Sequence, residues 1–162
     1  AAPSAQRPQL PNNCAMNGAW RAHGSSNDEM IAQLEDYGVI RDGRVRRAFR
    51  AVDRRAFVPA ESTDEAYCDE PLRRGHLHQS APHVYSTALQ ALELKKGMSF
   101  LNIGSGTGYL STMAAFLCGP GSIQHGIELH EEVVAHAVER HARHVSKYVE
   151  EHPRGSCEEE EE

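Results

Sequence analysis

The sequence lacks the features that mark membrane-spanning, secreted and metal-binding proteins. No apolar run approaches the roughly 18–20 residues that a transmembrane helix needs, so no membrane partner is expected. The first residues, AAPSAQRPQLPNNCA, contain neither a basic head nor an apolar stretch, which predicts no signal peptide. The cysteines include no CxxC pair, so we expect reduced thiols, a cytoplasmic location and no zinc site: Cys14, Cys68, Cys118 and Cys157.

Charge of one sign is also absent as a dominant feature. The 162 residues carry a net charge of −6, and 40% of them are hydrophobic, which is typical of one globular domain rather than of a nucleic-acid-binding protein. Seven arginines nevertheless cluster over fifteen positions: Arg41, Arg44, Arg46, Arg47, Arg50, Arg54 and Arg55. No aromatic stacking platform accompanies them, so a solvated helix face is preferred over a nucleic-acid patch.

The first half of the chain predicts helices. Residues 1–18 hold three prolines and few large apolar residues, which predicts a disordered lead-in. A capping box at 26–29 precedes an apolar pattern that predicts one helix. A turn is predicted at Asp42-Gly43, followed by a second amphipathic helix over 45–52. Residues 59–75 are expected to form a loop, and a third helix is predicted from Pro82 to the Lys95-Lys96-Gly97 stop.

The pattern changes at residue 98. Residues 100–103 and 123–129 predict two buried strands, and residues 109–118 and 131–148 predict two helices, the second with a face of valines and one alanine. This order is the opening of a doubly wound α/β sheet. We therefore divide the chain into a lead-in (1–18), a helical extension (19–97), a partial Rossmann-like domain (98–150) and an acidic disordered tail (151–162).

A glycine-rich loop, Gly104-Ser105-Gly106-Thr107-Gly108, joins the first predicted strand to its helix. Such a loop lets the backbone approach a ligand and directs N–H groups at it. The spacing matches neither GxGxxG nor a P-loop. Glu128 ends the next strand, where a carboxylate accepts hydrogen bonds from ribose hydroxyls. Together they favour an adenosine-containing ligand, and the alternative is a purely structural turn with an exposed glutamate.

Histidines gather in the last predicted helix, at 136, 141 and 144, with His130 and His152 nearby. Only the 141/144 pair has a spacing that shares a helix face, and no cysteine or adjacent acid completes a ligand set. We predict no metal site.

Several stretches together resemble one enzyme family. FLNIGSGTGYLS and GIELH resemble motif I and the second-strand acid of class I S-adenosylmethionine (AdoMet) methyltransferases. AVDRRAFVP and GHLHQSAPHVYS narrow the resemblance to protein-L-isoaspartate O-methyltransferases, and LNIGSGTGYLSTM is similar to the isoaspartate methyltransferase domain-containing subfamily. The implied fold is α/β: the N-terminal part of a Rossmann-like doubly wound sheet, preceded by a helical N-terminal extension.

The resemblance also implies roles for particular residues. The cofactor would be AdoMet, held by Gly104, Ser105, Gly106, Thr107, Gly108, Glu128, Leu129 and His130. The substrate would be an isoaspartyl-containing protein or peptide, bordered by Ser80, Ala81, Pro82 and His83, with Ser80 in the position of the active-site serine. The implied reaction moves a methyl group onto the α-carboxylate of an isoaspartyl residue. Because that carboxylate is already ionised, positioning and desolvation would suffice without a strong general base.

The sequence departs from the family pattern in ways that leave alternatives open. Asn102 replaces the usual motif I acid, His78-Gln79 precede Ser80, and Tyr85 stands where histidine is common. The later strands have no counterpart, so we predict an incomplete sheet in a C-terminally truncated chain that does not turn over efficiently. One alternative is a catalytically silent AdoMet-binding recognition module of a ubiquitin-ligase receptor type, although the ligase-recruiting segment of that subfamily is also missing. The other is a truncated product without function.

Overall fold

The structure, a computed structural model, describes residues 22–151, with side chains described up to residue 146. The predicted lead-in and all but the first residue of the predicted acidic tail lie outside this range. The elements follow in chain order: α1 (Asn27–Asp36), α2 (Gly43–Ala51), the 3-10 helices η1 (Arg54–Phe57) and η2 (Ala60–Glu65), β1 (Leu72–Arg74), β2 (Leu77–Gln79), α3 (Pro82–Leu92), β3 (Phe100–Ile103), α4 (Tyr109–Cys118), β4 (Gln124–Ile127) and α5 (Glu131–Glu151).

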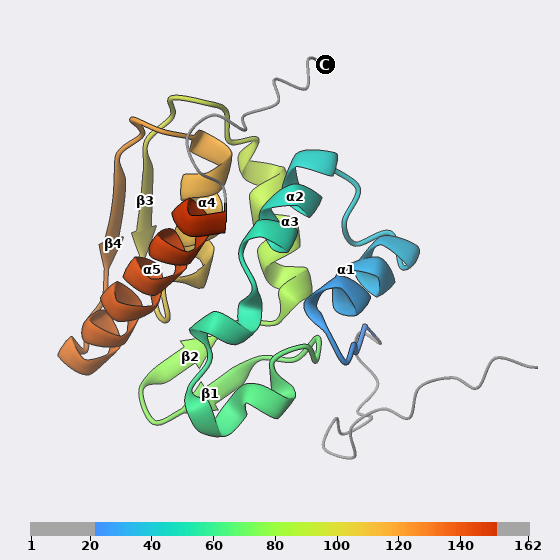
Figure 1. Cartoon of the computed structure of the whole chain (residues 1–162), viewed down its shortest axis with the longest axis horizontal. Helices are drawn as coiled ribbons and strands as arrows, with labels where there is room; N and C mark the ends of the chain where they lie inside the picture. The colour runs from blue at the N-terminus through green and yellow to red at the C-terminus, as the bar shows by residue number, and fades with distance from the viewer. Residues whose placement is uncertain (1–21, 152–162) are drawn as a thin grey trace, which may run out of the picture.

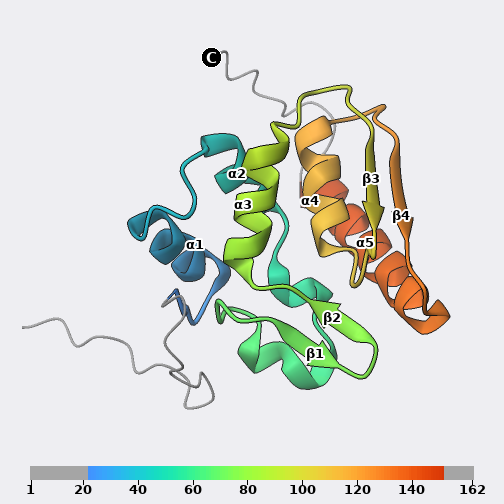
Figure 2. The ribbon, with the colours of Figure 1, turned by 180° about the vertical axis from the view of Figure 1, so that it is seen from behind.

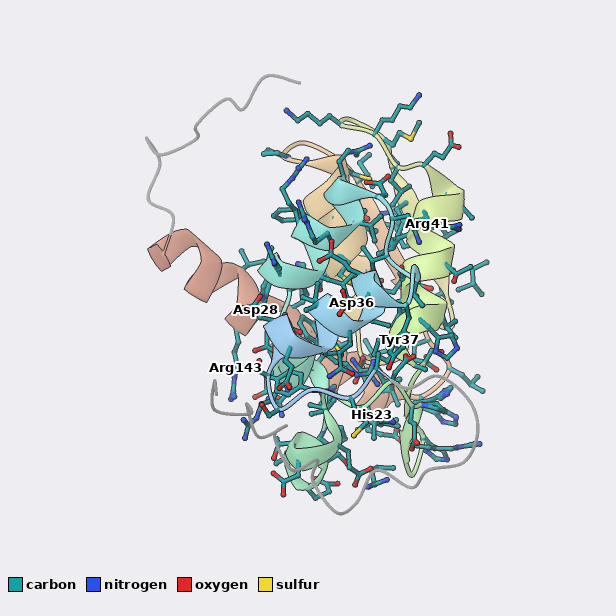
Figure 3. The ribbon with its side chains drawn as sticks, turned by 90° about the vertical axis from the view of Figure 1, so that its right-hand side faces the viewer. His23, Asp28, Asp36, Tyr37, Arg41 and Arg143 are labelled. Carbon is teal, nitrogen blue, oxygen red and sulfur yellow. The ribbon has the colours of Figure 1, made fainter. Side chains whose placement is uncertain are left out.

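The first two helices begin at capped residues. The Ser26 hydroxyl accepts a hydrogen bond from the Glu29 N–H, which starts α1 as the capping pattern predicts. Asp42 accepts hydrogen bonds from two N–H groups of α2, so the predicted turn is the N-cap of that helix. Figure 3 shows α1 on the outside of the molecule, where Asp28, Asp36 and Tyr37 face solvent.

The segment predicted as a loop over 59–75 contains two elements, so that prediction is wrong in part. Residues 60–65 form η2, and β1 pairs antiparallel with β2, Leu72 opposite Gln79. Gly75 lies in the turn with φ +57°, a conformation that glycine adopts without strain. Strands of three residues leave too few alternations for a period-two pattern to be detected in the sequence.

The second half forms the predicted strand, loop, helix, strand and helix, but the prediction that both strands are buried is wrong, because one face of this two-stranded sheet is uncovered. β3 and β4 pair in parallel, with Phe100 opposite Gln124 and Ile103 opposite Ile127. α4 lies between this sheet and the helices α2 and α3, as both views show (Figure 1 and Figure 2). The opposite face of the sheet is apolar and open: Ile103 is 76% exposed, and Leu101 and Ile127 are each 54% exposed.

The larger of two hydrophobic clusters joins α1, α2, α3 and α4, and a smaller one contains Val58, Ala66 and Leu72. Tyr109, the first residue of α4, lies at the centre of the larger cluster and makes edge contacts with Phe49 of α2 and Tyr85 of α3. Its ring is completely buried. The core therefore contains residues from both sides of residue 97, and the domain boundary that the sequence suggests there stays a prediction.

α5 packs through a different face from the one that its valines suggest. Val134, Val138 and Val145 of the predicted apolar face are exposed, whereas Val133 is fully buried and His136 is partly buried. Figure 1 shows α5 crossing beside the sheet. The sequence pattern identified a helix, and tertiary contacts selected the face that packs.

None of the helices within residues 22–151 combines the length and the apolar character that crossing a bilayer requires.

Cys118 is a buried free thiol, but Cys68 forms a disulfide, so the expectation that every thiol is reduced is wrong at Cys68.

Stability at alkaline pH should depend on Tyr67. Its hydroxyl donates to the two carboxylate oxygens of Asp53 at 3.0 and 3.1 Å. Burial, with the Asp53 charge as the second cause, raises the pKa of Tyr67 to about 12 from 10.0. The unfolded chain therefore loses this proton first as pH rises. The stabilisation is complete below pH 10 and is lost between about pH 10 and about pH 12.

Replacing Tyr67 with phenylalanine should lower the free energy of unfolding by about 1–2 kcal/mol at pH 8, because a hydrogen bond to a charged group is lost. The free energy of unfolding of this variant should also fall less steeply than that of the wild type as pH rises above 10. Urea unfolding from pH 8 to pH 11.5 measures both effects, with the exposed Tyr37→Phe as the matched control. A Tyr67→Phe variant with the wild-type pH slope would contradict the assignment.

Candidate functional site

The glycine loop lies at the carboxyl ends of β3 and β4. The N–H groups of Gly104 and Ser105 both donate to the carbonyl of Ile127, at 2.8 and 3.0 Å. These bonds tie the start of the loop to the last residue of β4. In doubly wound folds, ligands bind in the crevice outside the carboxyl ends of the strands, so the loop occupies the expected edge.

The three glycines of the loop have positive φ angles but different surroundings. A Cβ on Gly106 would lie 2.8 Å from the carbonyl oxygen of His78, and one on Gly108 would lie 3.2 Å from the Cβ of Ala137. Gly104 has nothing within 4 Å of that position. Packing of β2 and α5 therefore accounts for Gly106 and Gly108, whereas Gly104 presents open backbone to a ligand.

Glu128 is held beside the loop, as the sequence predicts. Its Oε2 accepts a hydrogen bond from the Gly106 N–H at 2.9 Å, and its Oε1 accepts one from the Leu129 N–H at 2.7 Å. The Gly106 hydrogen bond, followed by that of Leu129, lowers the pKa of Glu128. The group is therefore an oriented carboxylate at neutral pH, and its oxygens keep further acceptor capacity. The Leu129 side chain itself is 85% exposed.

The Ser80–His83 segment leads from β2 into α3. The Ser80 N–H donates to the hydroxyl of Tyr85 at 2.8 Å, and the Ser80 carbonyl accepts from Arg54 at 2.7 Å. Ala81 is the N-cap of α3, and Pro82 is its first residue. Both the N–H and the ring Nδ1 of His83 lie 2.9 Å from Oδ1 of Asp69, whose side chain is fully buried.

Arg54 lies in the interior rather than on the predicted solvated helix face. It is completely buried, so the prediction of a solvated arginine face is wrong at this position. Its guanidinium donates to the carbonyls of Ser80 and Glu70, the latter at 3.1 Å, and it lies 5.9 Å from the centre of the Tyr109 ring. The available signal was that Arg54 follows the end of the amphipathic pattern and therefore does not belong to the polar face of α2.

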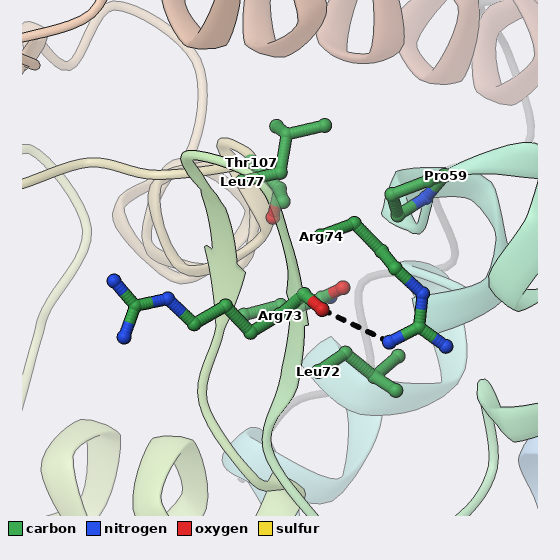
Figure 4. Close-up of a pocket in the computed structure, with 7 residues that line it drawn as sticks. Pro59, Leu72, Arg73, Arg74, Leu77 and Thr107 are labelled. Atoms are coloured by element: carbon green, nitrogen blue, oxygen red, sulfur yellow. Dashed lines mark hydrogen bonds between the residues drawn. The ribbon is translucent and has the colours of Figure 1, made fainter.

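A small surface hollow lies between the β1–β2 hairpin and the glycine loop (Figure 4). Thr107 of the loop and Gln79 of β2 both line it, and Arg74 donates to the carbonyl of Arg73 at its rim. Thr107 and Gln79 are almost completely buried. Within the part of the chain that the structure describes, the Thr107 hydroxyl and both amide atoms of Gln79 have no hydrogen-bond partner.

The histidines of α5 make structural contacts. A ring nitrogen of His136 lies 2.9 Å from the carbonyl of Phe57, His141 lies 2.9 Å from the hydroxyl of Thr112, and His144 packs against the Phe57 ring. Burial lowers the pKa of His141. His130 behaves differently, because its ring stacks on that of His76 from the β1–β2 turn, with Glu132 beside them. The sequence gives no sign that an acid and a second histidine join His130, because His76 lies 54 residues away.

Comparisons with known sequences agree on one family. The family model described as protein-L-isoaspartate(D-aspartate) O-methyltransferase matches residues 25–152. Protein-L-isoaspartate O-methyltransferase 1 of Arabidopsis thaliana is 40% identical over 114 residues, which are 68% of this chain and 49% of that protein. The Triticum aestivum enzyme is 38% identical over 118 residues, 70% of this chain and 50% of that protein. The chain thus spans about half the length of these relatives.

Comparison with solved structures confirms the predicted fold. A Plasmodium falciparum protein described as a protein-L-isoaspartate O-methyltransferase, in complex with S-adenosyl-L-homocysteine, superposes with a TM-score of 0.68 at 25% identity, covering 79% of this chain and 60% of that one. A second protein-L-isoaspartate O-methyltransferase structure gives a TM-score of 0.59 at 24% identity, covering 72% and 38%, and supports the fold alone. The chain belongs to the protein-L-isoaspartate(D-aspartate) O-methyltransferase family.

Proposed function

We propose that this chain provides the AdoMet-binding and substrate-positioning part of a protein-L-isoaspartate O-methyltransferase. The observation that carries the proposal is the Glu128 carboxylate, which the Gly106 N–H holds beside the glycine loop at the ends of β3 and β4. The family membership and the S-adenosyl-L-homocysteine bound by the Plasmodium falciparum neighbour support the same ligand class.

The residues present fit such a cofactor. Glu128 retains acceptor capacity for ribose hydroxyls, and Gly104 leaves open backbone where the methionine part would pass. The other predicted cofactor contacts remain predictions: Ser105, Thr107, Leu129 and His130. When bound, AdoMet supplies an activated methyl group on a sulfonium. The attacking group is a substrate carboxylate, so the chain has only to orient it and exclude water.

Ser80 to His83 are the proposed substrate contacts. The backbone of Ser80 is fixed on one side by Arg54 and on the other by Tyr85, and His83 is fixed by Asp69. Burial raises the pKa of Tyr85, which keeps it a neutral phenol that accepts from the Ser80 N–H. A segment held on both sides suits a reaction in which rate depends on placing a carboxylate rather than on proton transfer.

Titration of the whole chain with AdoMet, by calorimetry and by melting temperature, tests the cofactor assignment. We expect saturable binding with a raised melting temperature. Replacing Glu128 with glutamine should weaken binding by about 1.5–3 kcal/mol, roughly tenfold or more, because hydrogen bonds to a charged group are weakened. Glu131→Gln, an exposed glutamate three residues further on, is the matched control and should bind normally. Equal affinity in wild type and Glu128→Gln would refute the assignment.

Methyl transfer to an isoaspartyl peptide, with the matching aspartyl peptide as control, tests the reaction. Ser80→Ala should reduce transfer while leaving AdoMet binding intact. Binding without transfer would instead support the silent recognition module. The ubiquitin-ligase link and the cytoplasmic location stay predictions from the sequence.

A further inference from the structure

Three side chains of types that bind metals in other proteins meet beside the hairpin, and one of them, His130, is also a predicted AdoMet contact. His76 comes from the turn between β1 and β2, whereas His130 and Glu132 come from the start of α5. One potential ligand atom from each lies within 4.8 Å of the others. His76 Nδ1 is 2.5 Å from Glu132 Oε1, and the rings of His76 and His130 stack with centroids 3.7 Å apart and planes 1° apart.

Two imidazoles and one carboxylate form a donor set that zinc uses with a fourth position left for water. At zinc–nitrogen distances of 2.0–2.1 Å, tetrahedral donors lie about 3.4 Å apart. The donor atoms, now within 4.8 Å of one another, must therefore rearrange: His76 Nδ1 and Glu132 Oε1, 2.5 Å apart, must separate by about 0.9 Å, and any wider pair must approach by at most about 1.4 Å. The side chains can do this, because those of His76 and Glu132 are 57% and 62% exposed. The stacked rings would splay so that their lone pairs converge on one ion.

A surface ion pair gives little reason for this arrangement by itself, since exposed pairs contribute about 0–1 kcal/mol. The ligands also come from segments 54 residues apart in sequence, so a shared ion would link the β1–β2 turn to the start of α5. We propose that His76, His130 and Glu132 form a Zn²⁺ site that fastens the β1–β2 hairpin to the start of α5. Because His130 is also a predicted AdoMet contact, the proposal is tested in the absence of AdoMet, and its outcome does not depend on methyl transfer.

Calorimetric titration of the metal-free 162-residue chain with Zn²⁺ at pH 7.5 tests the site. We expect one tight Zn²⁺ per chain, and each of His76→Ala, His130→Ala and Glu132→Gln should weaken it at least about tenfold because a ligand of a three-residue set is lost. Two matched controls should leave the affinity unchanged: His78→Ala, an exposed histidine of the same hairpin, and Glu131→Gln, the neighbouring exposed glutamate.

A second measurement separates a built site from scattered histidines. Zn²⁺ should raise the melting temperature of the wild type but not of His76→Ala, and Co²⁺ should give the visible absorption of a four-coordinate ion only in the wild type and the controls. The site is disproved if His76→Ala binds Zn²⁺ as tightly as the wild type, or if His78→Ala weakens binding to the same degree. The exposed positions of His76 and Glu132 allow their variants to fold, which unchanged melting of the metal-free forms verifies.

Discussion

Replacing Arg54 with methionine should lower the free energy of unfolding by about 2–4 kcal/mol. The guanidinium is completely buried and donates to the carbonyls of Ser80 and Glu70. Without it, each carbonyl loses its donor, at about 1–3 kcal/mol apiece. The substitution also removes the desolvation penalty of the buried charge, which offsets part of this loss, and methionine fills most of the volume. We expect the lost hydrogen bonds to outweigh that relief.

Arg54→Lys separates charge from geometry. Lysine keeps the positive charge but has no planar fork with which to reach two carbonyls ten residues apart, so it should recover only part of the loss. Urea unfolding measures the effect, with Arg47→Met, an exposed arginine of α2, as the matched control. Amide hydrogen exchange should rise over residues 77–83 in Arg54→Met, because Ser80 loses its anchor. Stability within about 0.5 kcal/mol of the wild type, the usual range of surface substitutions, would show that Arg54 is not an anchor.

The parts of the fold that local chemistry decides were predicted from the sequence. α4 begins and ends where the sequence predicts, because glycines flank it on both sides. The start of α1 follows from its capping serine. The meeting of the glycine loop and Glu128 was also predictable, since the ends of adjacent parallel strands share one edge of a sheet.

The rest of the candidate site depends on contacts between distant segments. Arg54 reaches Ser80 over 26 residues, and His76 reaches Glu132 over 56. Contacts between distant segments leave no periodic pattern in the sequence. The three-residue strands that bring His76 into place are also too short to be recognised from the sequence. The packing face of α5 could not be read from the sequence for a related reason. Its valines form a regular stripe, yet among the α5 valines whose side chains the structure describes, Val133, beside that stripe, is the buried one.

Gly106 and Gly104 should respond differently to the same added methyl group. Gly106 has φ +54°, and a Cβ there would lie 2.8 Å from the His78 carbonyl oxygen, a backbone atom that cannot rotate away. Gly104 has φ +77° with open space around the added atom. Gly104→Ala should therefore cost only the left-handed strain of about 1–2 kcal/mol. Gly106→Ala adds a steric conflict and should cost about 3–4 kcal/mol in total.

Urea unfolding and AdoMet titration of both variants distinguish packing from ligand contact. Gly106→Ala should lose most stability, because relieving the conflict requires β2 to move away from the loop and disturbs the Gly106 hydrogen bond to Glu128. Gly104→Ala should keep most of its stability yet bind AdoMet more weakly, since its methyl group occupies space next to the proposed ligand. Equal losses of stability would mean that the hairpin is not held against the loop, and then Ser80 and Glu128 would have no fixed relation to each other.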